Sequence, residues 1–202
     1  DKDGNRLWYF IRPGVKCWNI GVPIGTFYYT LFRKKPRTMF LADSYLRWVT
    51  GNPEEKFQDI TMAEFEKMFQ QSVEKFPDAA FDNVDLSEFA AHGGKLLIDH
   101  GLNDPLIPVD GTINYYSRMV DFLGKEKVDD FCRLYIVPGD GHGNCWSEQP
   151  GITEGAGIDA LVDWVEHGIA PKGLYGVKVD RKSRKIWKEK TINPVTDIRD
   201  WM

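Results

Sequence analysis

Two short apolar runs alternate with two amphipathic stretches between residues 95 and 168. The runs KLLIDH (95–100) and FCRLYIV (131–137) have the length and composition of buried strands. Residues 110–123 and 158–168 repeat apolar side chains at helical spacing, with Asp110 expected as the N-cap of the first helix and Gly124 as its left-handed stop. This strand–helix–strand–helix order predicts parallel βαβ units, and therefore the α/β class.

The chain divides into three parts by composition. Residues 1-90 are rich in Gly, Pro and aromatic residues and predict a loop-rich, lid-like lobe with a short helix at 44–49 and an amphipathic helix at 61–76. The second helix starts with a capping box, Thr61 and Glu64. Residues 91-174 contain the α/β pattern, and 175-202 predict a basic, solvent-exposed hairpin tail.

Composition excludes several classes of protein. Hydrophobic residues make up 42% of the chain and aromatic residues 13%, which indicates a folded globular protein. The net charge of −4 gives no reason to expect nucleic acid or a membrane surface as a partner, and no apolar run approaches the ~20 residues of a membrane span. The first residues resemble neither a signal peptide nor a natural start.

Two polar residues follow the two predicted strands. Asp104 lies after the first strand and His142 after the second, and loops at the carboxyl ends of parallel strands meet at one edge of a sheet. A carboxylate followed by a histidine is the order of the last two members of a Ser–Asp–His triad in this class of fold. His100, at the end of the first strand, is a weaker candidate for the same site, and His92 and His167 are weaker still.

The segments GGKLLIDHGLNDPLIP, VPGDGHGNC and ALVDWVEHGIAP resemble the tannase/feruloyl esterase family of α/β-hydrolases over roughly residues 85–172. Upstream, DGNRLWYF and DSYLRWV resemble the end of that family's lid domain more loosely. The resemblance implies that Asp104 and His142 are the catalytic Asp and His. It also implies that the chain is the C-terminal part of the hydrolase sheet with part of the lid.

Other features of the family are expected upstream. The chain contains no G-x-S-x-G. The resemblance implies that the nucleophilic serine, the oxyanion hole and any lid calcium belong to a missing N-terminal half, and no cofactor is expected here. The family typically has a Cys directly after the catalytic His, bonded to a Cys before the Ser. Here Gly143 follows His142, and Cys145 is the candidate for that disulfide tether, which would suit a secreted or periplasmic enzyme.

The expected function is hydrolysis of aromatic carboxylic esters of the galloyl or feruloyl type, by the complete enzyme and not by this chain alone. Two alternatives remain open from the sequence. One is a peptidase of the prolyl oligopeptidase type, which shares the HGxxD and GHG loops. The other is a non-enzymatic module, because the chain has no nucleophile.

Overall fold

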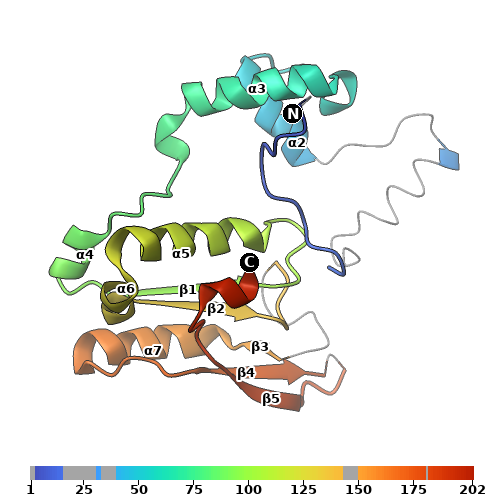
Figure 1. Ribbon diagram of the computed structural model, residues 1–202. Helices are drawn as coiled ribbons and strands as arrows, with labels where there is room; N and C mark the ends of the chain where they lie inside the picture. Colours follow the sequence, from blue (N-terminus) through green and yellow to red (C-terminus); the bar gives the residue numbers. More distant parts are fainter. Residues whose placement is uncertain (1–2, 16–30, 33–39, 143–149, 181) are drawn as a thin grey trace. The chain divides into compact units, whose positions relative to one another are not determined.

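The computed structural model describes residues 3–15, 31–32, 40–142, 150–180 and 182–202 (Figure 1). The chain forms two compact units, one of residues 1–9 and 17–81 and the other of residues 10–16 and 82–202. The division lies between residues 81 and 82, whereas the sequence predicted a boundary at residue 90. The reason is α4 (Ser87–Ala91), whose Phe89 packs edge-on against Phe131 at a centroid distance of 6.2 Å. This short helix therefore belongs to the α/β unit.

The first unit contains the helices α2 (Phe40–Thr50) and α3 (Met62–Lys75), with 3-10 turns at Phe57–Asp59 and Pro77–Ala79. The predicted capping box of α3 is confirmed, since the side chain of Glu64 accepts from the N–H of Thr61 at 2.6 Å and the reciprocal bond is present. Lys75 donates to the carbonyl of Val49 at the end of α2. The Lys75 contact holds the C-terminal end of α3 against the C-terminal end of α2.

The second unit is built around two parallel strands, β1 (Leu96–Gly101) and β2 (Cys132–Val137), paired in register from Leu96 with Cys132. Side chains of β2 alternate between two faces. Leu134 and Ile136 pack on the side of α5 (Val109–Leu123), whereas Tyr135 and Val137 pack on the side of α7 (Glu154–His167). Figure 1 shows these helices on opposite sides of the strands, the layered arrangement of an α/β fold.

The ends of α5 differ from those predicted. Pro108 is the N-cap and Asp110 lies inside the first turn, where its carboxylate binds the guanidinium of Arg12 at 2.5 Å. Gly124 has a positive φ of 86°, but its ψ of 141° is not that of a left-handed helix stop, and α6 (Lys125–Phe131) begins directly after it. The Arg12 contact also explains why residues 10–16 group with the α/β unit. Helix α7 ends at Gly168, which has a left-handed conformation with φ 71° and ψ 14°.

The C-terminal residues are part of the α/β unit and not a separate tail. The predicted hairpin is present as β4 (Leu174–Val179) and β5 (Ile186–Ile192), and β4 also pairs with β3 (Gly151–Ile152) in an antiparallel sheet. The following turn, Ile198–Trp201, packs on the α5 core, and the N–H of Val195 donates to the carbonyl of Leu134 at 2.8 Å.

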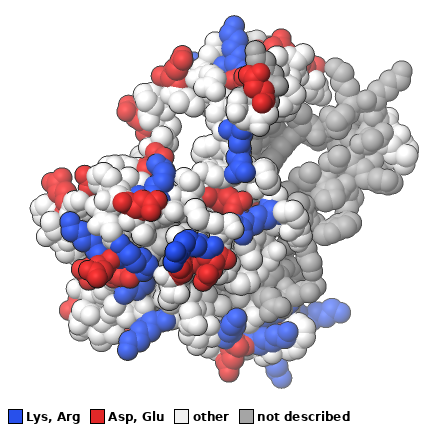
Figure 2. Space-filling view, viewed as in Figure 1, with Lys and Arg blue, Asp and Glu red and all other residues white. Residues whose placement is uncertain are grey.

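Charges are mixed on the face drawn in Figure 2, where Lys and Arg side chains alternate with Asp and Glu over the described surface. The described residues on this face form no extended area of one sign. Among the residues described, no helix is both long enough and apolar enough to cross a membrane.

Candidate active site

Asp104 ends a tight turn that begins at the last residue of β1. The N–H of Asp104 donates to the carbonyl of Gly101 at 3.1 Å, which closes the turn. Its side chain is only 7% exposed. One carboxylate oxygen, Oδ1, accepts from the N–H groups of Leu106 at 2.8 Å and Ile107 at 2.9 Å. The turn therefore fixes the carboxylate and leaves its second oxygen, Oδ2, for another partner.

That partner is His142, which follows β2. Nδ1 of His142 lies 3.0 Å from Oδ2 of Asp104, and the imidazole is half-exposed. Asn103 joins the two loops, because its N–H donates to the carbonyl of Asp140 at 3.0 Å and its side chain donates to the carbonyl of Pro138 at 2.6 Å. The expectation that Asp104 and His142 lie within hydrogen-bonding reach at one sheet edge is confirmed.

The surroundings of Asp104 favour its ionised form. Burial is the largest single influence and raises the pKa of Asp104, but the N–H groups of Ile107 and Leu106 and the imidazole of His142 together outweigh it and hold the pKa below its ordinary value. An ionised carboxylate can only accept, so Nδ1 of His142 carries the proton. In the neutral imidazole the lone pair is then on Nε2, which can act as a general base.

A second imidazole lies beside the same carboxylate. Nε2 of His100 is 3.7 Å from Oδ2 of Asp104, and the ring also contacts Ile107 and Thr112. His100 is thus at the site, as the weaker sequence prediction placed it. The other two histidines have different contacts: His92 with the carbonyl of Glu88, and His167 with Asp163 on α7.

The chain is similar in sequence to proteins of one known family. A sequence profile for the family described as "Tannase and feruloyl esterase" matches residues 44–195. The chain belongs to the tannase and feruloyl esterase family. At the family level this favours the esterase expectation over the peptidase alternative.

Individual members of the tannase and feruloyl esterase family are similar over part of their length. A probable feruloyl esterase from Arthroderma benhamiae is 37% identical over 127 residues, which cover 60% of this chain and 23% of that protein. A tannase from Aspergillus oryzae is 36% identical over 98 residues, or 45% of this chain and 17% of that protein. The chain therefore spans less than a quarter of the length of these relatives.

A solved structure shows the same fold. The crystal structure of an esterase from Aspergillus oryzae superposes with a TM-score of 0.75 and 22% sequence identity, covering 96% of this chain and 39% of that chain. At this identity the likeness speaks for the fold alone. It is consistent with a partial α/β fold for this chain.

Sequence reasoning did not identify Asp140, which is buried beside the candidate pair in this family member. Asp140 is 5% exposed, and its side chain accepts from the N–H of Ile152 at 3.2 Å, so it links the His142 loop to β3. Two glycines make room for this residue. A Cβ on Gly101 would lie 2.4 Å from the carbonyl oxygen of Asp140, and a Cβ on Gly151 would lie 1.7 Å from its Oδ1.

The cysteine predictions divide into two groups. Cys17 and Cys145 lie outside the described residues, so the tether proposed for Cys145 stays a prediction. Cys132 is a free, buried thiol on β2. Burial raises the pKa of Cys132 to about 12 in spite of the nearby Arg133, so this thiol is not an activated nucleophile.

No group of three or more His, Cys, Asp or Glu side chains that could hold a metal ion occurs within the described part of the chain.

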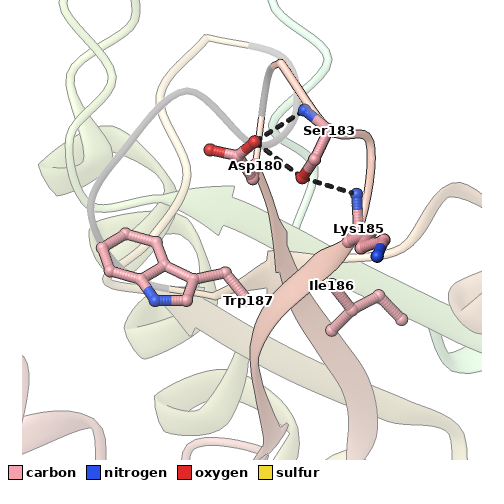
Figure 3. A pocket seen from close by; sticks show the side chains of 5 residues that line it. All are labelled: Asp180, Ser183, Lys185, Ile186 and Trp187. Atoms are coloured by element: carbon pink, nitrogen blue, oxygen red, sulfur yellow. Dashed lines mark hydrogen bonds between the residues drawn. The ribbon is translucent and has the colours of Figure 1, made fainter.

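A shallow depression of about 320 Å³ lies at the β4–β5 turn, lined by Asp180, Ser183, Lys185, Ile186 and Trp187 (Figure 3). There the carboxylate of Asp180 accepts from the N–H and hydroxyl of Ser183, both at 2.7 Å, which closes the turn. Neither Asp104 nor His142 lines this depression.

Proposed function

We propose that this chain supplies the Asp and His of a serine-type carboxylic ester hydrolase that acts on aromatic esters. The observation that carries the proposal is the 3.0 Å contact between Nδ1 of His142 and Oδ2 of the buried Asp104, at the ends of neighbouring parallel strands. A carboxylate bound to Nδ1 fixes the tautomer in which Nε2 takes a proton from an alcohol.

In the proposed mechanism, Nε2 of His142 removes the proton of a serine hydroxyl as the oxygen attacks the ester carbonyl. Asp104 stays ionised and stabilises the imidazolium that forms. His142 then gives this proton to the alcohol oxygen of the ester as the bond between that oxygen and the acyl carbon breaks. The alcohol leaves, and the acyl group stays on the serine. A water molecule hydrolyses the acyl-serine by the same steps, with His142 again as base and then as acid.

This chain does not contain the nucleophilic serine of the proposed mechanism. None of its serines, at positions 44, 72, 87, 117, 147 and 183, stands between glycines in a G-x-S-x-G. We therefore propose that the serine and the oxyanion hole come from a further segment of the same enzyme, which is the expected partner of this chain. Cys145 is proposed to tether the His142 loop to that segment by a disulfide, which implies an extracytoplasmic location.

The substrate class follows from the names of relatives, a probable feruloyl esterase and a tannase. Feruloyl and galloyl esters both have an aromatic acyl group on an alcohol. Nucleic acid and membranes are not proposed as partners.

The test uses purified chain, the serine-bearing segment from the same reading frame, and their mixture, with methyl ferulate, methyl gallate and a proline-containing peptide as substrates. We expect ester hydrolysis only when both parts are present, because loss of the triad serine alone typically costs on the order of 10⁶ in turnover. Robust ester hydrolysis by the isolated chain would refute the proposal that the nucleophile is absent from it. Cleavage of the peptide without ester hydrolysis would support the peptidase alternative, and no activity in either assay would support the non-enzymatic one.

A further inference from the structure

His100 is held by two hydrogen bonds near the end of β1, and a third polar group lies close to it. Its Nε2 lies 3.1 Å from the carbonyl oxygen of Ile107 and its Nδ1 lies 2.7 Å from the hydroxyl of Thr112. Oδ2 of Asp104 is farther away, at 3.7 Å from Nε2, and the imidazole is only 10% exposed. The catalytic scheme proposed above gives this buried imidazole no task.

The partners of His100 determine where its proton lies. A backbone carbonyl can only accept, so Nε2 must carry the proton that the carbonyl of Ile107 receives. In the neutral ring Nδ1 then accepts from the hydroxyl of Thr112, which lies in the first turn of α5. The helix thus fixes the ring, and the ring fixes the carbonyl of Ile107.

Ile107 is held on both sides by this arrangement. Its carbonyl accepts from His100, while its N–H donates to Oδ1 of Asp104 at 2.9 Å. The N–H of Leu106 points to the same oxygen. Any drift of the 104–107 turn would therefore withdraw the donors that hold the Asp104 carboxylate toward His142.

We propose that His100 is a positioning residue for the Asp104–His142 pair, which acts by holding the carbonyl of Ile107. The assignment rests on the proposed function of that pair. The hydrogen bond from His100 to Ile107 also explains why Oδ2 of Asp104 binds His142 and not His100. Two imidazoles face Asp104, His100 from β1 and His142 from the loop after β2. Because the Nε2–H of His100 is committed to Ile107, Oδ2 is left to His142.

The test uses three variants of the 202-residue chain. His100→Phe keeps a ring of similar size and removes the donor. His100→Gln restores an N–H donor on a flexible chain that can reach the carbonyl. Thr112→Val keeps the shape of the side chain and removes the hydroxyl that orients the ring. His92→Phe is the matched control, because it removes an imidazole–carbonyl contact on α4, away from this turn.

Two NMR measurements report on the turn directly. The first is the pH titration of the Asp104 carboxyl carbon, and the second is amide hydrogen exchange at Leu106 and Ile107. In His100→Phe we expect the pKa of Asp104 to move upward, because the N–H donors that lower it are no longer held in place. We expect exchange of both amides to become roughly tenfold faster, the equivalent of one lost hydrogen bond.

We expect His100→Gln to return both readouts most of the way to those of the unaltered chain, and Thr112→Val to shift them in the same direction as His100→Phe by less. An unchanged titration and exchange in His100→Phe would overturn the assignment. So would a His100→Gln variant as disturbed as His100→Phe, since only the ring's shape would then matter. If His100→Phe does not fold, Thr112→Val decides. Neither readout uses ester hydrolysis, so an error in the proposed function would be detected separately by the ester assay.

Discussion

Oδ2 of Asp104 lies 3.0 Å from Nδ1 of His142, although 38 residues separate them in the chain. The contact depends on β1 and β2 being parallel neighbours, which brings the two following loops to one edge of the sheet. The bond from the Asn103 side chain to the carbonyl of Pro138 then holds the loops together. Sheet pairing and loop-to-loop hydrogen bonds thus fix the geometry before any substrate is present.

The first prediction concerns this pair in the complete enzyme. His142→Ala removes the proposed base, and we expect it to lower kcat for methyl ferulate by roughly 10⁶. Asp104→Asn removes the negative charge that fixes the tautomer, and we expect a loss of about 10⁴. His167→Ala is the control, because this imidazole is more than half exposed on α7 and lies beside Asp163, away from the Asp104–His142 pair in the sequence. Activity within tenfold of the unaltered enzyme in His142→Ala would exclude His142 as the base.

The second prediction concerns the stability of this chain in acid. The folded pKa of Asp104 is lowered, so the ionised carboxylate contributes stability above its unfolded pKa of about 3.9 and this contribution is lost as the pH falls through the folded value. We expect Asp104→Asn to lower the melting temperature most near neutral pH. The difference from the unaltered chain should narrow as the pH falls below about 4. A difference that stays constant between neutral and acidic pH would contradict the assigned shift.

The third prediction tests the packing of Asp140 against two glycines. A Cβ on Gly151 would overlap Oδ1 of Asp140, so we expect Gly151→Ala to destabilise the chain by about 1–3 kcal/mol in denaturant unfolding. Gly157 on α7 is the matched control, since a Cβ there meets nothing within 4 Å. Gly157→Ala should be neutral or stabilising by up to about 1 kcal/mol. Equal destabilisation by both substitutions would show that the Asp140 contact is not the cause.

Much of this site could be predicted from the sequence because its signals are local. The apolar runs around Leu97 and Leu134 identify parallel strands, and Asp104 and His142 stand directly after them. Asp140 could not be predicted in the same way. An Asp between glycines is usually a turn former, and its burial depends on Gly151 and Ile152, which lie beyond the next loop.

The same limit applies to the boundaries of the parts. β3 has two residues, too few to show a strand period, so its pairing with β4 could not be predicted and the C-terminal hairpin resembled a separate tail. Asp110 resembled a helix cap, but Pro108 already fixes the first turn and Arg12, far away in the chain, binds the carboxylate. Contacts between distant segments decided each of these cases.

The last prediction distinguishes the cysteines by thiol labelling of the folded chain, followed by peptide mapping. Cys132 is buried and its pKa is raised to about 12, so we expect labelling there only after unfolding. Cys145 should be labelled within minutes in this chain, because its proposed disulfide partner belongs to the serine-bearing segment. In the complete, oxidised enzyme Cys145 should be protected until a reductant is added. Rapid labelling of Cys145 in that oxidised enzyme would show that the tether is absent, and the proposed extracytoplasmic location would lose its support.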